Sequence, residues 1–274
     1  MRIQVDHRTV YRYAEPPRRV LQLLRLTPAS FTGQSVLEWR IDVDCDARLR
    51  EGRDGYGNVT HMLYVDQPAE RLTVSVTGVV LTEDHAGVVR GLANDLPPEV
   101  FLRSTELTAP GPHLQELVTK FDDGGSTLDS LHKLNGELHR RLRFDTKATG
   151  TETTAEDAFS AGEGVCQDFA HIFIAVSRLI GVPARYVSGH FHRRDGVEVQ
   201  EAAHAWAEAF VEDLGWVAFD PAHGLSKDEN YVRVACGLDY RDASPISGAR
   251  VGGGDEQLDV EVRVNGHSQQ QVQN

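Results

Sequence analysis

The chain has 274 residues, of which 40% are hydrophobic and 25% charged, as is typical of a soluble globular protein with one large or two ordinary domains. A formal net charge of −13 argues against unspecific binding to nucleic acid and disfavours an anionic membrane surface. The three cysteines, Cys45, Cys166 and Cys236, are far apart and do not suggest a disulfide framework. The polar N-terminus has no signal-peptide pattern and no apolar run is long enough to span a membrane, so a reducing cytoplasm is the expected location.

Residues 1–105 are expected to form a β-rich domain. Residues 37–44 alternate apolar and polar side chains, and residues 72–77 do the same. Glycines in residues 55–58 indicate a turn between strands. Several short alternating strands separated by turns predict an antiparallel, β-sandwich-like N-terminal domain.

From about Ser126 the apolar period becomes helical. One stripe predicts a helix that packs on a core, and it consists of Leu128, Leu131, Leu134, Leu138 and Leu142. A short helix is expected near residues 155–160, because Thr154 and Asp157 have the spacing of a capping box.

The next predicted helix begins near Cys166. A glycine-rich loop at residues 162–164 precedes it, and Gly181 and Pro183 end it. Its buried face consists of Phe169, Ile172, Phe173, Val176, Leu179 and Ile180. In the first turn, free backbone N–H groups and the helix dipole favour a thiolate and can donate to an oxyanion. Cysteine is also a common small apolar residue at a helix start, so its partners decide the interpretation.

Two strands after this helix carry an imidazole and a carboxylate. Residues 197–211 are predicted to form one strand that contains His204, and residues 216–220 a second that ends at Asp220. If the strands pair as a hairpin, His204 comes opposite the region of Asp220. The carboxylate can then hold one imidazole nitrogen and leave the other free to take a thiol proton.

Several motifs together resemble the transglutaminase-like superfamily of papain-like cysteine enzymes. They are GVCQDFAH around Cys166, AHAWAEAF around His204, and GWVAFDP, which contains Asp220. The segments YRYAEPP and DGYGN resemble the β-rich domain that precedes this core in bacterial members. The segment CGLDYRDASPISG resembles the closing segment of the family, except that Leu238 stands where an arginine is expected.

The resemblance implies an α+β fold, in which a nucleophile helix packs on an antiparallel sheet behind the N-terminal domain. The expected domains are residues 1–105, a transglutaminase-like core of residues 106–250, and residues 251–274 with a glycine linker, a possible last strand at 258–264 and a disordered tail. The resemblance also implies a catalytic triad in which Cys166 is the nucleophile, His204 the base and then acid, and Asp220 the orienting carboxylate.

The expected function is cysteine-dependent acyl transfer on a peptide or protein amide through a thioester. Hydrolysis is favoured mildly, because water needs no dedicated second site, and transfer to an amine stays open, because the triad serves both. It identifies the amide of Cys166 as one oxyanion donor and no second donor, and it does not indicate an oligomeric state. Since no calcium-type acidic loop and no zinc-type cysteine pair occur, no metal or cofactor is expected.

Two other hypotheses about the function remain open. One is a binding or scaffold module that keeps the fold without turnover. The other is a metal-dependent hydrolase that uses His190, His192 and His204, although no carboxylate at a recognised spacing completes this ligand set.

Overall fold

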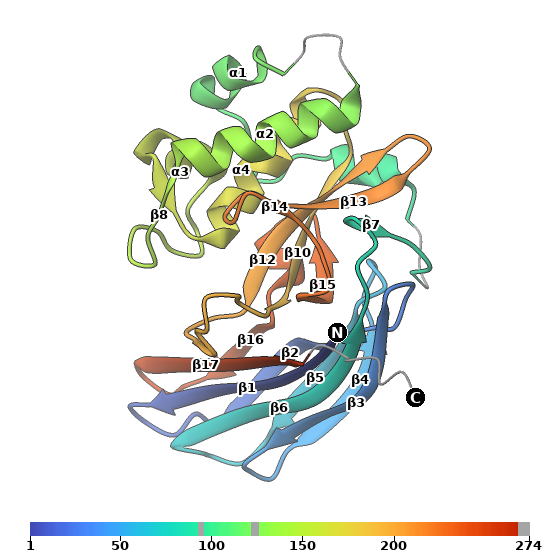
Figure 1. The fold of residues 1–274 in the computed structure, drawn as a ribbon. Coiled ribbons are helices and arrows are strands. Elements are labelled where there is room, and N and C mark those ends of the chain that lie inside the picture. Colours follow the sequence, from blue (N-terminus) through green and yellow to red (C-terminus); the bar gives the residue numbers. More distant parts are fainter. Residues whose placement is uncertain (93–95, 122–125, 268–274) are drawn as a thin grey trace, which may run out of the picture.

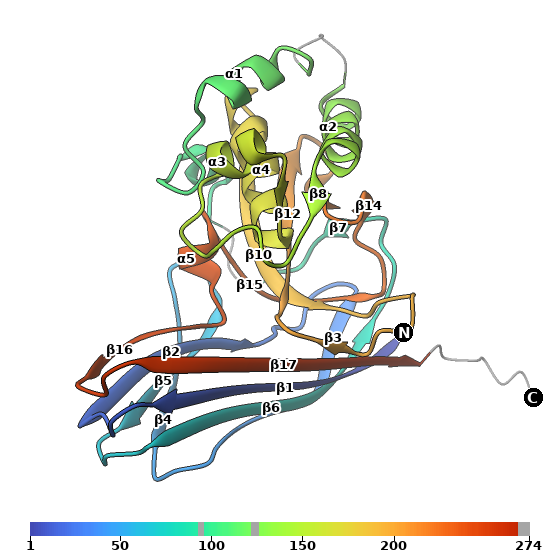
Figure 2. The same cartoon turned by 90° about the vertical axis from the view of Figure 1, so that its left-hand side faces the viewer.

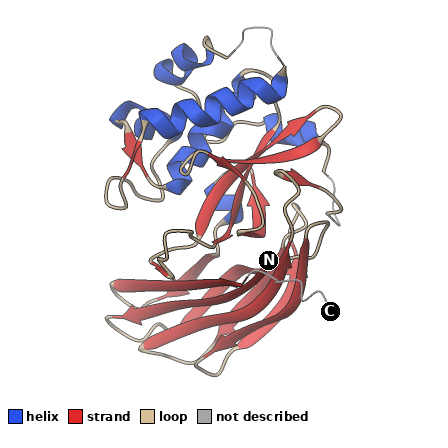
Figure 3. Ribbon diagram, in the orientation of Figure 1, coloured by secondary structure: helices blue, strands red, loops and turns tan. Residues whose placement is uncertain are grey.

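The computed structural model describes residues 1–92, 96–121 and 126–267. A β-sandwich forms one end of the molecule, and a separate sheet covered by helices forms the other end (Figures 1 and 3). The predicted α+β fold is therefore confirmed. Within the described ranges, none of the helices is both long and apolar enough to cross a membrane.

The sandwich consists of two antiparallel sheets. One sheet has the order β11 (Val199–Gln200), β17 (Glu256–His267), β1 (Arg2–Tyr13), β6 (Arg71–Thr82) and β3 (Gln34–Val43). The other has the order β16 (Ile246–Val251), β2 (Arg19–Thr27), β5 (Val59–Val65) and β4 (Arg48–Arg53). Alternate side chains of β1 and β6 are buried, as period-two patterning requires.

The strand predicted at residues 37–44 is present as β3, but it carries a bulge. The pairing of β3 with β6 shifts between Val36 and Glu38, so Leu37 is the extra residue. The Leu37 side chain is 52% exposed. A bulge is invisible in an alternating pattern, because the pattern itself is unbroken.

Both ends of the chain build the sandwich. Strand β17 pairs with β1 from Arg2 opposite His267 to Tyr13 opposite Glu256. Strand β16 pairs with β2, and three glycines with positive φ, Gly252 to Gly254, turn the chain between β16 and β17. The last strand expected at residues 258–264 lies within β17 and completes the N-terminal sheet. Of the expected disordered tail, residues 268–274 lie outside the described residues.

The six-stranded sheet outside the sandwich, the core sheet, carries the helices. Its order is β14 (Leu225–Ser226), β13 (Gly215–Asp220), β12 (His204–Val211), β10 (Ala184–Phe191) and β15 (Tyr231–Gly237), and β7 (Val88–Val89) pairs with β13. The larger helices gather on one side of this sheet, as Figure 2 shows, and they are α1 (Pro112–Val118), α2 (Thr127–Arg141), α3 (Ala155–Ala161) and α4 (Cys166–Leu179). The shorter elements are η1 (Pro98–Leu102), β8 (Arg143–Phe144), β9 (Glu163–Gly164) and α5 (Tyr240–Ala243).

Small residues allow α4 to lie close to the sheet. Ala205, Ala207 and Ala209 of β12 are almost completely buried in the same core cluster as the apolar face of α4. The predicted cap of α3 is confirmed, since the Thr154 side chain accepts from the Asp157 backbone N–H. The buried alanines let α4 pack closely on β12.

The predicted single strand at residues 197–211 is wrong, because the chain leaves one sheet for the other inside it. Val199 and Gln200 pair with β17 of the sandwich, whereas His204 begins β12 of the core sheet. Residues 201–203 bend between them. This bend lies where the two sheets meet.

Side-chain amides tie the sandwich to the core sheet. Gln34 donates to the carbonyl of Arg233 and accepts from its N–H, both at 2.8 Å. Asn58 does the same with Cys236, at 2.7 Å and 2.8 Å. Each amide satisfies one donor and one acceptor of β15, as a neighbouring strand would.

Candidate active site

Cys166 occupies the first position of α4, where the sequence places it. Val165 is the N-cap residue, and its backbone N–H donates to Oδ2 of Asp168 at 2.8 Å. The Thr149 hydroxyl donates to the same oxygen at 2.5 Å, and burial raises the pKa of the Asp168 carboxyl. Asp168 therefore closes the first helical turn, while the Cys166 side chain remains partly exposed.

His204 lies between the thiol and a carboxylate. Its Nε2 is 2.7 Å from Oδ2 of Asp220, the last residue of β13. The Cys166 thiol also acts on His204, because it contributes to raising the pKa of the imidazole, and Nδ1 is the ring nitrogen that Asp220 leaves free. The hairpin of β12 and β13 pairs Ala207 with Phe219, and this register brings His204 and Asp220 together as predicted.

The charges of this group support one another. Burial alone would lower the pKa of His204, but the Asp220 carboxylate and the Cys166 thiol raise it to about 10. Burial opposes the charged form of Asp220 as well, but His204 and then His223 hold the pKa of its carboxyl well below the ordinary value. At neutral pH the pair is an imidazolium and a carboxylate.

The sequence reasoning missed two further partners of Asp220. Oδ2 also accepts from Nδ1 of His223 at 2.9 Å and from the hydroxyl of Tyr231 at 2.8 Å. Oδ1 accepts from the backbone N–H groups of Ala222 and His223 at 3.1 Å and 3.2 Å. The Asp220-Pro221 turn is a local signal that could have pointed to the residues just after it, whereas Tyr231 comes from a different strand and has none.

Aromatic rings enclose the pair. The Phe191 ring centroid lies 5.4 Å from that of His204 and 4.7 Å from that of His223. Trp206 is completely buried, and its ring lies 6.1 Å from His204. An apolar enclosure strengthens the ion pair, because it keeps water from the charged groups.

One group of potential metal ligands occurs among the described residues. His204, Asp220 and His223 offer ligand atoms within 4.8 Å of one another. Five donors already occupy Asp220, so a cation would have to displace some of them. The metal site of His190, His192 and His204 that the sequence left open is not formed among the described residues. The His190 ring packs against that of His7 instead, and His192 contacts Asn230.

Leu238, at the position where an arginine was expected, is buried in an apolar cluster with Phe101 and Trp216. Its carbonyl accepts from Nη2 of Arg178 at 2.7 Å. Arg178 also donates to the carbonyl of Phe101 at 2.9 Å, and burial lowers its pKa to about 10. A guanidinium thus reaches the closing segment from α4.

Two family models match the chain. The bacterial transglutaminase-like N-terminal region matches residues 3–81, and the transglutaminase-like superfamily matches residues 115–221. The second match contains Cys166, His204 and Asp220. The chain therefore belongs to the transglutaminase-like superfamily and carries the bacterial N-terminal region of that family.

Similar proteins cover the chain to different extents. An uncharacterized protein of Mycobacterium leprae is 32% identical, over 96% of this chain and 98% of its own length. A protein-glutamine gamma-glutamyltransferase of Pseudomonas aeruginosa is 29% identical over 34% of this chain and 14% of its own length. The crystal structure of a protein proposed to be a cysteine protease, from Cytophaga hutchinsonii, has a TM-score of 0.78 and 21% identity, with 97% of this chain and 90% of that chain covered. This structural likeness supports the fold of both parts.

Proposed function

We propose that the protein is a cysteine-dependent acyl-transfer enzyme that acts on amide bonds of a peptide or protein. The observation that carries the proposal is the position of His204, whose Nε2 lies 2.7 Å from Asp220 and whose pKa is raised by both Asp220 and the Cys166 thiol. A nucleophile, a base and an orienting carboxylate in this arrangement are the parts of a covalent catalytic site.

In the first half of the proposed reaction, the proton of the thiol already resides on the His204 imidazolium, and the Cys166 thiolate sulfur attacks the amide carbonyl carbon. The backbone N–H groups at the start of α4 stabilise the oxyanion. The C–N bond then breaks, the amine leaves with the proton from His204, and a thioester remains on Cys166. Asp220 keeps Nε2 of His204 protonated throughout.

In the second half, an acceptor attacks the thioester and His204 takes its proton. The C–S bond breaks, the product acid or amide leaves, and the sulfur returns to its starting state. Water as acceptor makes the enzyme a protease or amidase, which we favour because water needs no second binding site. The similarity to a protein-glutamine gamma-glutamyltransferase supports an amine acceptor as the second candidate.

The two acceptors are distinguished in one assay. Labelled casein is incubated with the protein and a fluorescent primary amine, and both peptide release and amine incorporation are followed. If water is the acceptor, casein peptides are released that carry no fluorescent amine. If the amine is the acceptor, it becomes attached to intact casein. Both signals are expected to vanish in Cys166→Ala and to persist in Cys236→Ala. If neither signal depends on Cys166 for casein or for a diverse peptide mixture, the binding-module alternative replaces the enzyme.

We also propose a reducing compartment as the place of action. Cys45, Cys166 and Cys236 are all free thiols, and the proposed nucleophile requires a reduced sulfur. Fractionation of cells that express the protein, with antibody detection, tests this location.

A further inference from the structure

A cavity of about 150 Å³ lies beside His204, between the core sheet and the sandwich. Its walls from the core come from β10, α5 and the bend before β12, namely Tyr186, Ser188, Ala202, Ala203, His204 and Tyr240. Facing them, β1 and β17 provide His7, Thr9, Tyr11, Leu258 and Val260, and Pro245 and Ile246 lie at the start of β16. Both ends of the chain therefore complete a space next to the candidate triad.

Two tyrosines connect this cavity to the nucleophile helix. The rings of Tyr186 and Tyr240 lie 6.2 Å apart, nearly perpendicular to each other. Burial raises the pKa of the Tyr186 phenol well above its ordinary value, and the nearby Cys166 raises it further. The Tyr240 backbone N–H donates to Nε2 of His171, on α4, at 3.0 Å. The cavity wall is thus held in place relative to Cys166.

The lining offers no free counter-charge. The His204 imidazolium is already paired with Asp220, and the described lining residues include no lysine, arginine, aspartate or glutamate. Burial lowers the pKa of His7 to about 4, so its imidazole is neutral at neutral pH. Burial also raises the pKa of Tyr11 and of Tyr240, so these phenols are neutral as well. A charged group that entered the cavity would lose its hydration without gaining a partner.

The volume matches one side chain. A cavity of about 150 Å³ lined by apolar residues can hold benzene, whereas pockets for whole drug-sized ligands are about 300 Å³ or larger. We propose that this cavity is a specificity subsite, which binds one large uncharged side chain, phenylalanine or leucine, flanking the amide that Cys166 attacks. This inference rests on the proposed function.

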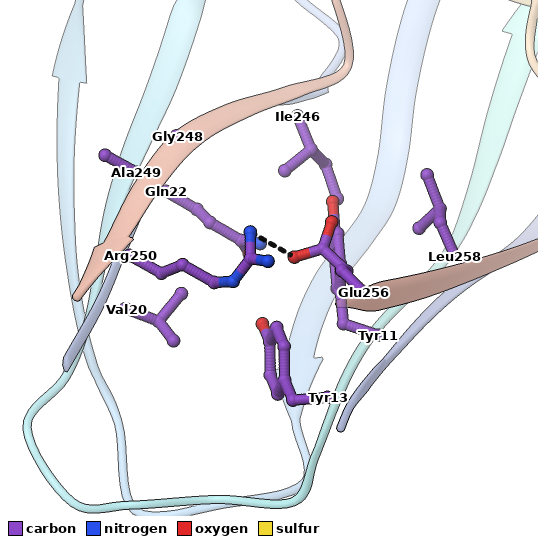
Figure 4. Close-up of a pocket in the computed structure, with 10 residues that line it drawn as sticks. All are labelled: Tyr11, Tyr13, Val20, Gln22, Ile246, Gly248, Ala249, Arg250, Glu256 and Leu258. Carbon is purple, nitrogen blue, oxygen red and sulfur yellow. Dashed lines mark ion pairs between the residues drawn. The ribbon is translucent and has the colours of Figure 1, made fainter. Parts of the chain in front are cut away.

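A second cavity, of about 240 Å³, adjoins the first and contains charged side chains. It shares Tyr11, Ile246 and Leu258 with the first, so the two are contiguous. Figure 4 shows the ion pair of Arg250 and Glu256 inside it, and their closest charged atoms are 3.3 Å apart. Leu258 lies at the junction, and its side chain is 51% exposed.

Two separate measurements test the subsite and the proposed function. Binding of the N-acetyl amides of Phe, Leu, Asp and Lys to the intact protein is measured by saturation-transfer NMR, which does not depend on turnover. Iodoacetamide labelling of Cys166 is measured in parallel. We expect the Phe and Leu amides to bind at least about tenfold more tightly than the charged ones, a difference of about 1.4 kcal/mol.

Leu258→Asp is expected to remove this preference. The matched control is Leu37→Asp, because Leu37 is 52% exposed on β3 of the same sheet and lines neither cavity. Ala202→Asp places a charge on the opposite wall at an exposed position and is expected to act like Leu258→Asp. Circular dichroism melting establishes that all three variants are folded.

Equal affinities for the four amides, or equal losses in Leu258→Asp and Leu37→Asp, would overturn the subsite. If Cys166 is then still labelled rapidly, the proposed function stands without it. Slow labelling of Cys166 together with the expected binding preference would instead remove the catalytic proposal and leave a pocket for an apolar side chain.

Discussion

Asp220 and His204 are joined at 2.7 Å through Oδ2 and Nε2, and this same oxygen also accepts from His223 and Tyr231. A carboxylate with so many donors is held both as an anion and in one orientation. The imidazole that it holds is oriented in turn, with its other nitrogen available to the Cys166 thiol. The rigidity of the candidate site therefore originates at the end of β13.

Tyr231→Phe is expected to lower the free energy of unfolding by about 1.5–3 kcal/mol, because the fully buried hydroxyl donates to an ionised carboxylate at 2.8 Å. Urea denaturation measures the change. Tyr13→Phe is the matched control, since the Tyr13 hydroxyl is buried and has no hydrogen-bond partner among the described residues. Similar losses in the two variants would mean that the bond to Asp220 contributes nothing.

The stabilising effect of the His204–Asp220 pair is expected to depend on pH. The folded-state pKa of His204 is raised from 6.5 to about 10, so the effect is complete below about pH 6.5 and is lost as the pH rises toward 10. The pKa of Asp220 is lowered, so the effect is also lost in acid, below about pH 3.8.

This dependence is measured as the difference in unfolding free energy between the wild type and Asp220→Asn at pH 5, 7 and 9. The difference is expected to be largest at pH 5 and smallest at pH 9. Asp195→Asn serves as a control, because Asp195 forms an exposed ion pair with Arg193 and has no histidine partner in the described structure. A constant difference for Asp220→Asn across this range would refute the raised pKa of His204.

Glu208→Gln is expected to destabilise the protein by about 3–5 kcal/mol, because it leaves two buried guanidinium groups without their counter-charge. Glu208 is fully buried between Arg185 and Arg233, at 2.6 Å and 2.9 Å, and these two arginines lower its pKa to about 2 despite burial. Glu106→Gln removes an exposed partner of Arg241 and is expected to change stability by less than about 1 kcal/mol. Thermal melts of both variants report the contrast.

Gly189→Ala is expected to unfold or strongly destabilise the protein. A Cβ atom at Gly189 would lie 2.1 Å from the Val232 carbonyl oxygen and 2.6 Å from the Trp206 ring, so the strands beside His204 would have to move apart. Gly136→Ala in α2 meets no atom within 4 Å and is expected to stabilise the protein by up to about 1 kcal/mol. Equal stability of the two variants would contradict this account of β10 packing.

The local parts of the site could be predicted from the sequence. The helix that begins at Cys166 follows from its apolar period and its glycine and proline boundaries, and the hairpin of His204 and Asp220 follows from alternation and a short turn. These features depend on residues close together in the chain. The catalytic roles of the three residues remain a prediction.

The long-range parts could not be predicted. Nothing in the pattern of residues 258–264 says that this strand pairs with β1 at the other end of the chain. For the same reason, the pattern of residues 197–211 did not reveal that Val199 and Gln200 join the sandwich. The cavity beside His204 depends on both pairings, so no local pattern could have indicated it.

The most direct test of the account is the iodoacetamide alkylation rate of each cysteine at pH 6, read by peptide mass spectrometry. Cys45 is a slow internal reference, because burial and then Asp44 raise its pKa. Cys236 is a buried reference. Cys166 is expected to react at least about tenfold faster than both and to lose this advantage in His204→Ala, as a thiolate held by an imidazolium would. A Cys166 rate equal to that of Cys45, or unchanged in His204→Ala, would contradict the central claim that His204 activates this thiol.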